Sequence, residues 1–159
     1  MKNLYVLMFV VLFSFTNNVS AQLTNAQKES IKKEVLKINE KEVSSMKLLD
    51  ADAMSEFWST EIISATVCWD SLINQYDSYE KFNKAVSNWF ASRKSQVVTI
   101  KQVNAEVLKE NLVLISEILH WDITWKNGFK QIGDSYVTIL WKKGNKGWKS
   151  IYYHESVAN

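Results

Sequence analysis

The chain of 159 residues carries 19 basic and 17 acidic side chains, so its net charge at pH 7 is only +2. Such a balance lacks the strongly basic surface that attracts nucleic acid or an anionic membrane, and the sequence predicts neither as a partner. Its single cysteine excludes an internal disulfide, so packing must stabilise the fold.

The first 21 residues have the pattern of a secretory signal. Lys2 precedes an apolar run over residues 4–15, and the small residues Ser20 and Ala21 follow at the positions that a signal peptidase reads. The run is about 12 residues long, whereas a membrane span needs about 20. We therefore expect a signal peptide over residues 1–21 and one domain over residues 22–159. The protein would be exported, periplasmic or secreted, and free of the membrane after cleavage.

Helices are predicted for the first half of this domain. Thr24 and Gln27 fit a capping box, and apolar residues at helical spacing continue from there to about Leu49. A short second helix is expected over residues 53–58, and Ser78 caps a third helix whose dipole Arg93 complements at its end. Between these helices, residues 61–69 favour a strand, whereas the polar composition of residues 70–77 predicts a loop.

The second half alternates with period two. Strands are predicted over residues 97–107, 112–125, 135–142 and 148–155, and the last two flank the turn Gly144–Gly147. The order is helix, helix, strand, helix and four long antiparallel strands. This order predicts an α+β domain in which helices gather on one face of a curved sheet.

Three segments carry a resemblance to a known superfamily. They are Leu49-Asp50-Ala51-Asp52-Ala53-Met54 with the following Phe57-Trp58, the helix ending in Trp89-Phe90, and the closing hairpin from Tyr136 to Ser156. Together they resemble the nuclear-transport-factor-2-like superfamily, more narrowly its SnoaL-like and calcium/calmodulin-kinase-association-like relatives. Asp77-Ser78 stands where such proteins usually have glycines.

The resemblance implies a curved antiparallel sheet wrapped around three N-terminal helices, forming a cone with an open-ended pocket. Members are often dimers through the outer face of the sheet. Some are isomerases, dehydratases, cyclases or hydrolases, and others are non-catalytic binding or assembly modules. The resemblance therefore implies a fold and does not assign a reaction.

Strand alternation suggests which polar residues face the cone. Ser150, Tyr152 and His154 share one face of the last strand, and Ser116, His120 and Asp122 share one face of the strand over residues 112–125. Either set would place a few polar groups in an apolar cavity, the usual composition of a small-ligand site. The acid–base candidates are accordingly Asp122, His154 and His120, with Tyr136 or Tyr152 as an oxyanion-stabilising donor. A solvated or structural role at a strand end is the alternative.

The chain is rich in aromatic residues, with seven Trp, six Tyr and seven Phe. The candidates for ligand binding are Trp58, Trp69, Trp89, Tyr136 and Tyr152; the alternative is that such side chains fill the core. Trp121 and Trp125, which alternate on one face with Leu119, could instead form an apolar outer surface for a dimer partner.

No cofactor or metal is predicted, because the two histidines lie on separate strands without a ligand spacing and nucleotide-binding motifs are missing from the sequence. We expect an exported protein that binds a small apolar or aromatic molecule in its cone. The alternatives are a lyase or isomerase acting by proton transfer, and a non-catalytic module for homodimerisation or protein interaction.

Overall fold

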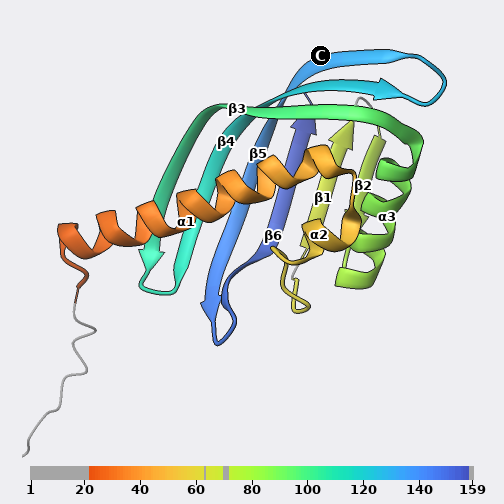
Figure 1. Ribbon diagram of the computed structural model, residues 1–159. Helices are drawn as coiled ribbons and strands as arrows, with labels where there is room; N and C mark the ends of the chain where they lie inside the picture. Colours follow the sequence, from red (N-terminus) through yellow and green to blue (C-terminus); the bar gives the residue numbers. More distant parts are fainter. Residues whose placement is uncertain (1–21, 63, 70–71, 158–159) are drawn as a thin grey trace, which may run out of the picture.

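The computed structural model describes residues 22–62, 64–69 and 72–157, so the predicted signal peptide lies outside the described residues. Helices and a 3-10 turn open the domain and strands close it (Figure 1). In chain order the elements are α1 (Asn25–Ser45), η1 (Met46–Leu48), α2 (Ala51–Ser55), β1 (Ser64–Trp69), β2 (Leu72–Tyr76), α3 (Tyr79–Ser92), β3 (Arg93–Lys109), β4 (Leu112–Trp125), β5 (Lys130–Gly144) and β6 (Gly147–Val157).

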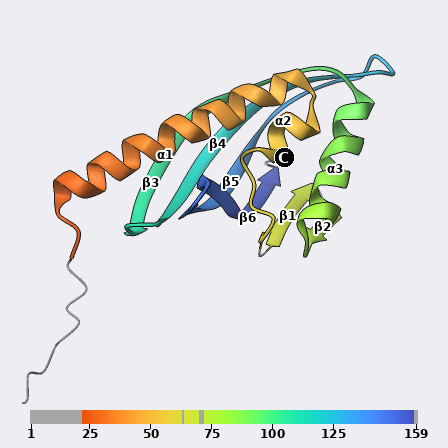
Figure 2. The ribbon, with the colours of Figure 1, turned by 60° about the horizontal axis from the view of Figure 1, so that its bottom comes forward.

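The helix α1 begins at the predicted capping box. The Thr24 hydroxyl accepts a hydrogen bond from the backbone N–H of Gln27 at 3.2 Å, and the Gln27 side chain accepts one from the backbone N–H of Thr24 at 2.9 Å. The helix then crosses the concave side of the sheet, and α2 and α3 lie beyond its C-terminal end (Figures 1 and 2). The helices therefore cover one face of the sheet, as expected.

The sheet has the strand order β2-β1-β6-β5-β4-β3. All neighbours are antiparallel except β1 and β6, which pair in parallel. The curved, unclosed sheet with helices on its inner side confirms the predicted α+β cone fold (Figure 2). The predicted loop over residues 70–77 was wrong, because residues 72–76 form strand β2. Pairing with β1 satisfies the backbone groups of this polar segment and outweighs its composition.

A bulge changes the phase of β6. Leu140 pairs with Tyr152 and Trp141 pairs with Ser150, so Ile151 is left opposite no residue of β5. The extra residue turns Tyr153 and Glu155 to the inner face together with Ser150, and it turns Tyr152 and His154 outward. The prediction that Ser150, Tyr152 and His154 share a face was therefore wrong, because strict alternation does not survive a bulge.

The hydrophobic core lies between the helices and the inner face of the sheet. Phe82 of α3 is its aromatic centre: its ring stacks on Trp58 at a centroid distance of 4.2 Å and packs against Tyr153 at 5.8 Å. Trp141 of β5 is fully buried. Aromatic packing of this kind joins the helices to the sheet, since these residues come from the segment after α2, from α3 and from the sheet.

Candidate functional site

A cavity of about 520 Å³ opens at the end of the domain where α2 and α3 meet the sheet. Most of its walls are aromatic or aliphatic, and they come from every layer of the fold. The lining residues are Met46, Met54, Trp58, Val67, Asn74, Phe82, Val86, Trp89, Phe90, Arg93, Trp121, Trp125, Phe129, Gln131, Tyr153 and Glu155.

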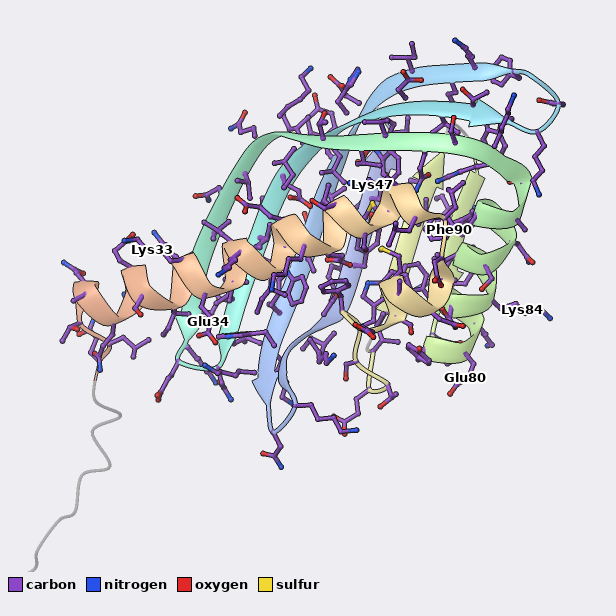
Figure 3. All side chains as sticks on the ribbon, in the orientation of Figure 1. Lys33, Glu34, Lys47, Glu80, Lys84 and Phe90 are labelled. Carbon is purple, nitrogen blue, oxygen red and sulfur yellow. The ribbon has the colours of Figure 1, made fainter. Side chains whose placement is uncertain are left out.

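The helix α3 supplies one wall because its sequence is amphipathic. Phe82, Val86 and Phe90 recur at intervals of four residues and are buried. In Figure 3, Phe90 lies on the side of α3 that faces α1 and the sheet, whereas Glu80 and Lys84 point away. The apolar side of α3 therefore faces the cavity.

Arg93 is the cation of the cavity. It is the first residue of β3 and is only 7% exposed. One guanidinium nitrogen donates to the Gln96 side chain, which in turn donates to the carbonyl of Met46. The rings of Trp121 and Trp125 lie 5.8 and 5.5 Å from its Cζ, within the range of cation–π attraction. Burial lowers the pKa of Arg93, but a guanidinium still keeps its proton.

Glu155 is the acid of the cavity. Tyr153, two residues earlier on the same strand, donates its hydroxyl hydrogen to Oε2 of Glu155 at 2.9 Å. Burial raises the pKa of Glu155, and hydrogen bonds from Ser135 and Tyr153 together with the charge of Arg93 oppose that rise. Ser135 is itself held by the indole N–H of Trp121, which donates to its hydroxyl at 2.6 Å.

Two further carboxyl groups lie behind the cavity wall. Glu42 of α1 accepts a hydrogen bond from the indole N–H of Trp58 at 2.6 Å, and Glu117 of β4 accepts one from the amide of Asn39 at 2.7 Å. Burial raises the pKa of Glu42 to about 8 and that of Glu117 to about 7. We call Glu42, Glu117 and Glu155 the buried acid cluster; all three act electrostatically on Tyr153.

The predicted acid–base residues lie outside the cavity. Asp122 and His120 belong to the outer face of β4, and His154 belongs to the outer face of β6. His120 contacts Asp134 there, with Nδ1 and Oδ1 2.7 Å apart, and Lys101 donates to the other oxygen of Asp134 at 2.6 Å. The structure does not bring these three candidates together with the apolar walls. Alternation separates the faces of a strand but does not tell which one the helices cover.

The predicted aromatic ligand-binding residues are divided between two faces. Trp58 and Trp89 line the cavity. Tyr136 is 54% exposed on the outer face, where Tyr152 also lies. The side chain of Trp69 lies outside the described residues. Trp121 and Trp125, considered for an outer dimer surface, line the cavity, so that alternative was wrong for these two residues.

The sequence reasoning missed Arg93, Glu155 and the rest of the buried acid cluster. One signal was available in α1, where buried residues recur at 35, 39, 42 and 43. Asn39 and Glu42 thus occupy apolar positions of an amphipathic helix, which marks them as polar groups with a buried partner. A second signal was that Arg93 is the only arginine of the chain.

In the part of the chain that the structure describes, no three His, Cys, Asp or Glu side chains gather as a metal site requires. None of the helices described there is both long and apolar enough to span a membrane.

The fold defines the class of protein. It is similar to a nuclear-transport-factor-2-like superfamily protein from Salmonella enterica serovar Typhimurium, with a TM-score of 0.72, 12% identity, and coverage of 82% of this chain and 93% of that one. It is similar to a hexachlorocyclohexane dehydrochlorinase at a TM-score of 0.70 and 7% identity, over 86% of this chain and 90% of that one. The protein thus has the nuclear-transport-factor-2-like fold.

The family follows from the sequence. Residues 31–159 match the model of the calcium/calmodulin-dependent protein kinase II association domain, and the chain belongs to this family. The association domain of that kinase from C. elegans is similar in structure, with a TM-score of 0.65, 15% identity, and coverage of 83% of this chain and 99% of that one. A comparison with curated proteins found no match.

The buried acid cluster predicts that stability falls as the pH rises. The pKa of Glu42 is about 8 in the folded chain, against 4.5 as the ordinary value. The native state therefore holds a proton that the unfolded state releases between these values, which destabilises the fold by up to about 1.4 kcal/mol per pH unit for each such group. Urea unfolding across this pH range should show a decreasing free energy of unfolding, and Glu42→Gln should flatten the decrease.

Glu34→Gln is the matched control. Glu34 lies on the exposed side of the same helix, and its hydrogen bond with Lys143 lowers its pKa, so its titration affects stability only at lower pH. The control should keep the full decrease. A free energy of unfolding that stays constant or rises from pH 5 to pH 8 would contradict the assignment.

Proposed function

We propose that this protein is exported and binds a small apolar or aromatic molecule in the cavity. The observation that carries the proposal is a preformed space of about 520 Å³ whose walls are mostly aromatic or aliphatic and which few polar side chains enter. This volume falls within the range of about 300–1,000 Å³ that is typical of small-molecule sites. Burial of a flat apolar ligand among indole and phenyl rings would release water from both surfaces.

A proton-transfer reaction is the weaker alternative. Asp122, His120 and His154 lie on the outer face, so a reaction in the cavity would have to use Glu155, whose carboxyl group is hydrogen-bonded to Tyr153. The hexachlorocyclohexane dehydrochlorinase shares the fold at 7% identity, which supports no transfer of catalytic residues. Binding of an apolar molecule, in contrast, requires no catalytic residue and only the apolar walls of the cavity.

We predict that naphthalene binds to the purified protein and quenches the tryptophan fluorescence of the cavity. Val86→Phe should weaken this binding about tenfold, because Val86 lines the cavity from α3 and a phenyl ring there would occupy ligand volume. Fluorescence titration of both proteins measures the effect.

Ser87→Phe is the control for this substitution. Ser87 is the next residue of α3 and is exposed, so the same ring would point into solvent and leave the affinity unchanged. Circular dichroism should show that both variants fold. Wild-type protein that fails to bind any aromatic probe, neutral or anionic, up to its solubility limit would refute the proposal.

Assembly through the outer sheet face is the second candidate, favoured by exposed apolar residues on that face. Ile132 is 64% exposed and Tyr136 is 54% exposed on β5, and Val97 is 57% exposed on β3. Val97 and Ile132 pair with the same residue of β4, Asp122, so they lie on one face. An apolar group of this kind is typical of a partner surface. The family of this chain and the similar C. elegans structure are both association domains.

We predict that the purified protein sediments as an oligomer and that Tyr136→Lys weakens its association, because a charge would be buried in an apolar interface. Analytical ultracentrifugation over a concentration series measures this. Leu48→Lys is the control, since Leu48 is 61% exposed on η1 and lies on the helical side. A wild-type monomer at every concentration would exclude assembly.

Export gives a separate prediction. If residues 1–21 are a signal peptide, mass spectrometry of protein recovered from the periplasm or the culture medium should find Gln22 as the first residue. Retention of Met1 in protein that stays in the cytoplasm would contradict export.

A further inference from the structure

Arg93 carries a charge that the described part of the chain leaves without an ionic partner. The side chain is 7% exposed, yet among the described residues no carboxylate oxygen lies within 4.0 Å of its guanidinium nitrogens. The Nε–H has no hydrogen-bond acceptor there, and of the guanidinium nitrogens only the one that donates to Gln96 has a protein partner. An unpaired buried cation of this kind is costly unless something completes its hydrogen bonds.

The position of Arg93 is fixed by its neighbours. Gln96 holds it from β3, and the indole rings of Trp121 and Trp125 flank it from β4. The side chain of Arg93 lines the same cavity as the aromatic walls, although its Nε is buried. It therefore presents preorganised N–H donors to whatever fills that space, and a planar fork of such donors matches a carboxylate.

We propose that the occupant of the cavity is an aromatic carboxylate, with its ring among the aromatic walls and its carboxylate paired with Arg93. This rests on the proposed function and adds the chemical class of the ligand. A neutral aromatic molecule would leave the guanidinium unpaired, whereas a carboxylate would satisfy it.

Glu155 decides how this binding depends on pH, because its charge also acts on Arg93. An ionised Glu155 competes with the ligand for the guanidinium, and a protonated Glu155 leaves Arg93 to the ligand. The titratable and charged groups that act on Glu155 or on the neighbouring Tyr153 are Arg93 of β3, Glu117 of β4, Tyr153 and His154 of β6, and Glu42 of α1. Since burial raises the pKa of Glu155, binding of an anion should take up a proton. Its affinity should fall as the pH rises.

The test compares indole-3-acetate with indole-3-acetamide by calorimetry on the purified protein. The two probes have nearly the same shape and differ in charge. The acid should bind at least about tenfold more tightly than the amide, since a hydrogen-bonded charge contributes more than a neutral group. Equal affinities, or a tighter amide, would overturn the proposal.

Variants locate the effect. Arg93→Gln should remove the preference for the acid, and Arg93→Lys should keep part of it because the charge remains without the planar fork. Lys101→Gln removes the same charge from the outer face and should leave the preference unchanged. A preference that survives in Arg93→Gln, or one that Lys101→Gln abolishes, would overturn the proposal. If circular dichroism shows that Arg93→Gln does not fold, the comparison of acid and amide binding to the wild type and to Arg93→Lys still tests the proposal.

The pH dependence of binding is tested with the variant Glu155→Gln. The wild type should bind indole-3-acetate more weakly as the pH rises through the range, above that of an ordinary glutamate, in which Glu155 ionises, and Glu155→Gln should bind it with a flatter pH dependence. An affinity of the wild type that increases with pH would contradict the role of Glu155. The two proposals fail separately: if neither probe binds, the small-molecule function fails, whereas if both bind equally, only the carboxylate assignment fails.

Discussion

The docking of α1 across the concave side of the sheet depends on buried polar contacts. Asn39 donates to Glu117 of β4, and Glu42 accepts from Trp58 in the segment that follows α2. These hydrogen bonds give partners to polar groups that would otherwise be costly in a core. They fix the long helix over the sheet and hold the end of α2 against it. The remaining space, between α2, α3 and the far part of the sheet, is the cavity.

The same contacts explain the electrostatics of the interior. Glu42, Glu117 and Glu155 are buried around Tyr153, and Arg93 is the buried cation beside them. Burial disfavours the ionised carboxyl groups and raises their pKa values, so the interior retains protons near neutral pH. The stability of the fold and the proposed ligand affinity would thereby depend on pH through one group of side chains. Perturbed carboxyl groups next to a cavity are a common feature of functional sites.

The two faces of the sheet carry the two proposed functions. The inner face lines a cavity that suits a small molecule, and the outer face carries exposed apolar residues such as Ile132 and Tyr136 that suit a partner. Relatives with this fold include an association domain and a dehydrochlorinase. Each use depends on the side chains of one face, so the fold alone does not choose between them.

The sequence by itself determined the order of the elements, the capping of α1 and the closing hairpin, because these depend on local periodicity and turn chemistry. The tertiary structure alone decided which face became the inside. One bulge at Ile151 reverses the faces of β6 and brings in Glu155 instead of His154. On β4, each face carries both apolar and polar residues, and the docking of the helices covers the one with Trp121. The site is therefore a product of long-range packing, which local patterns do not encode.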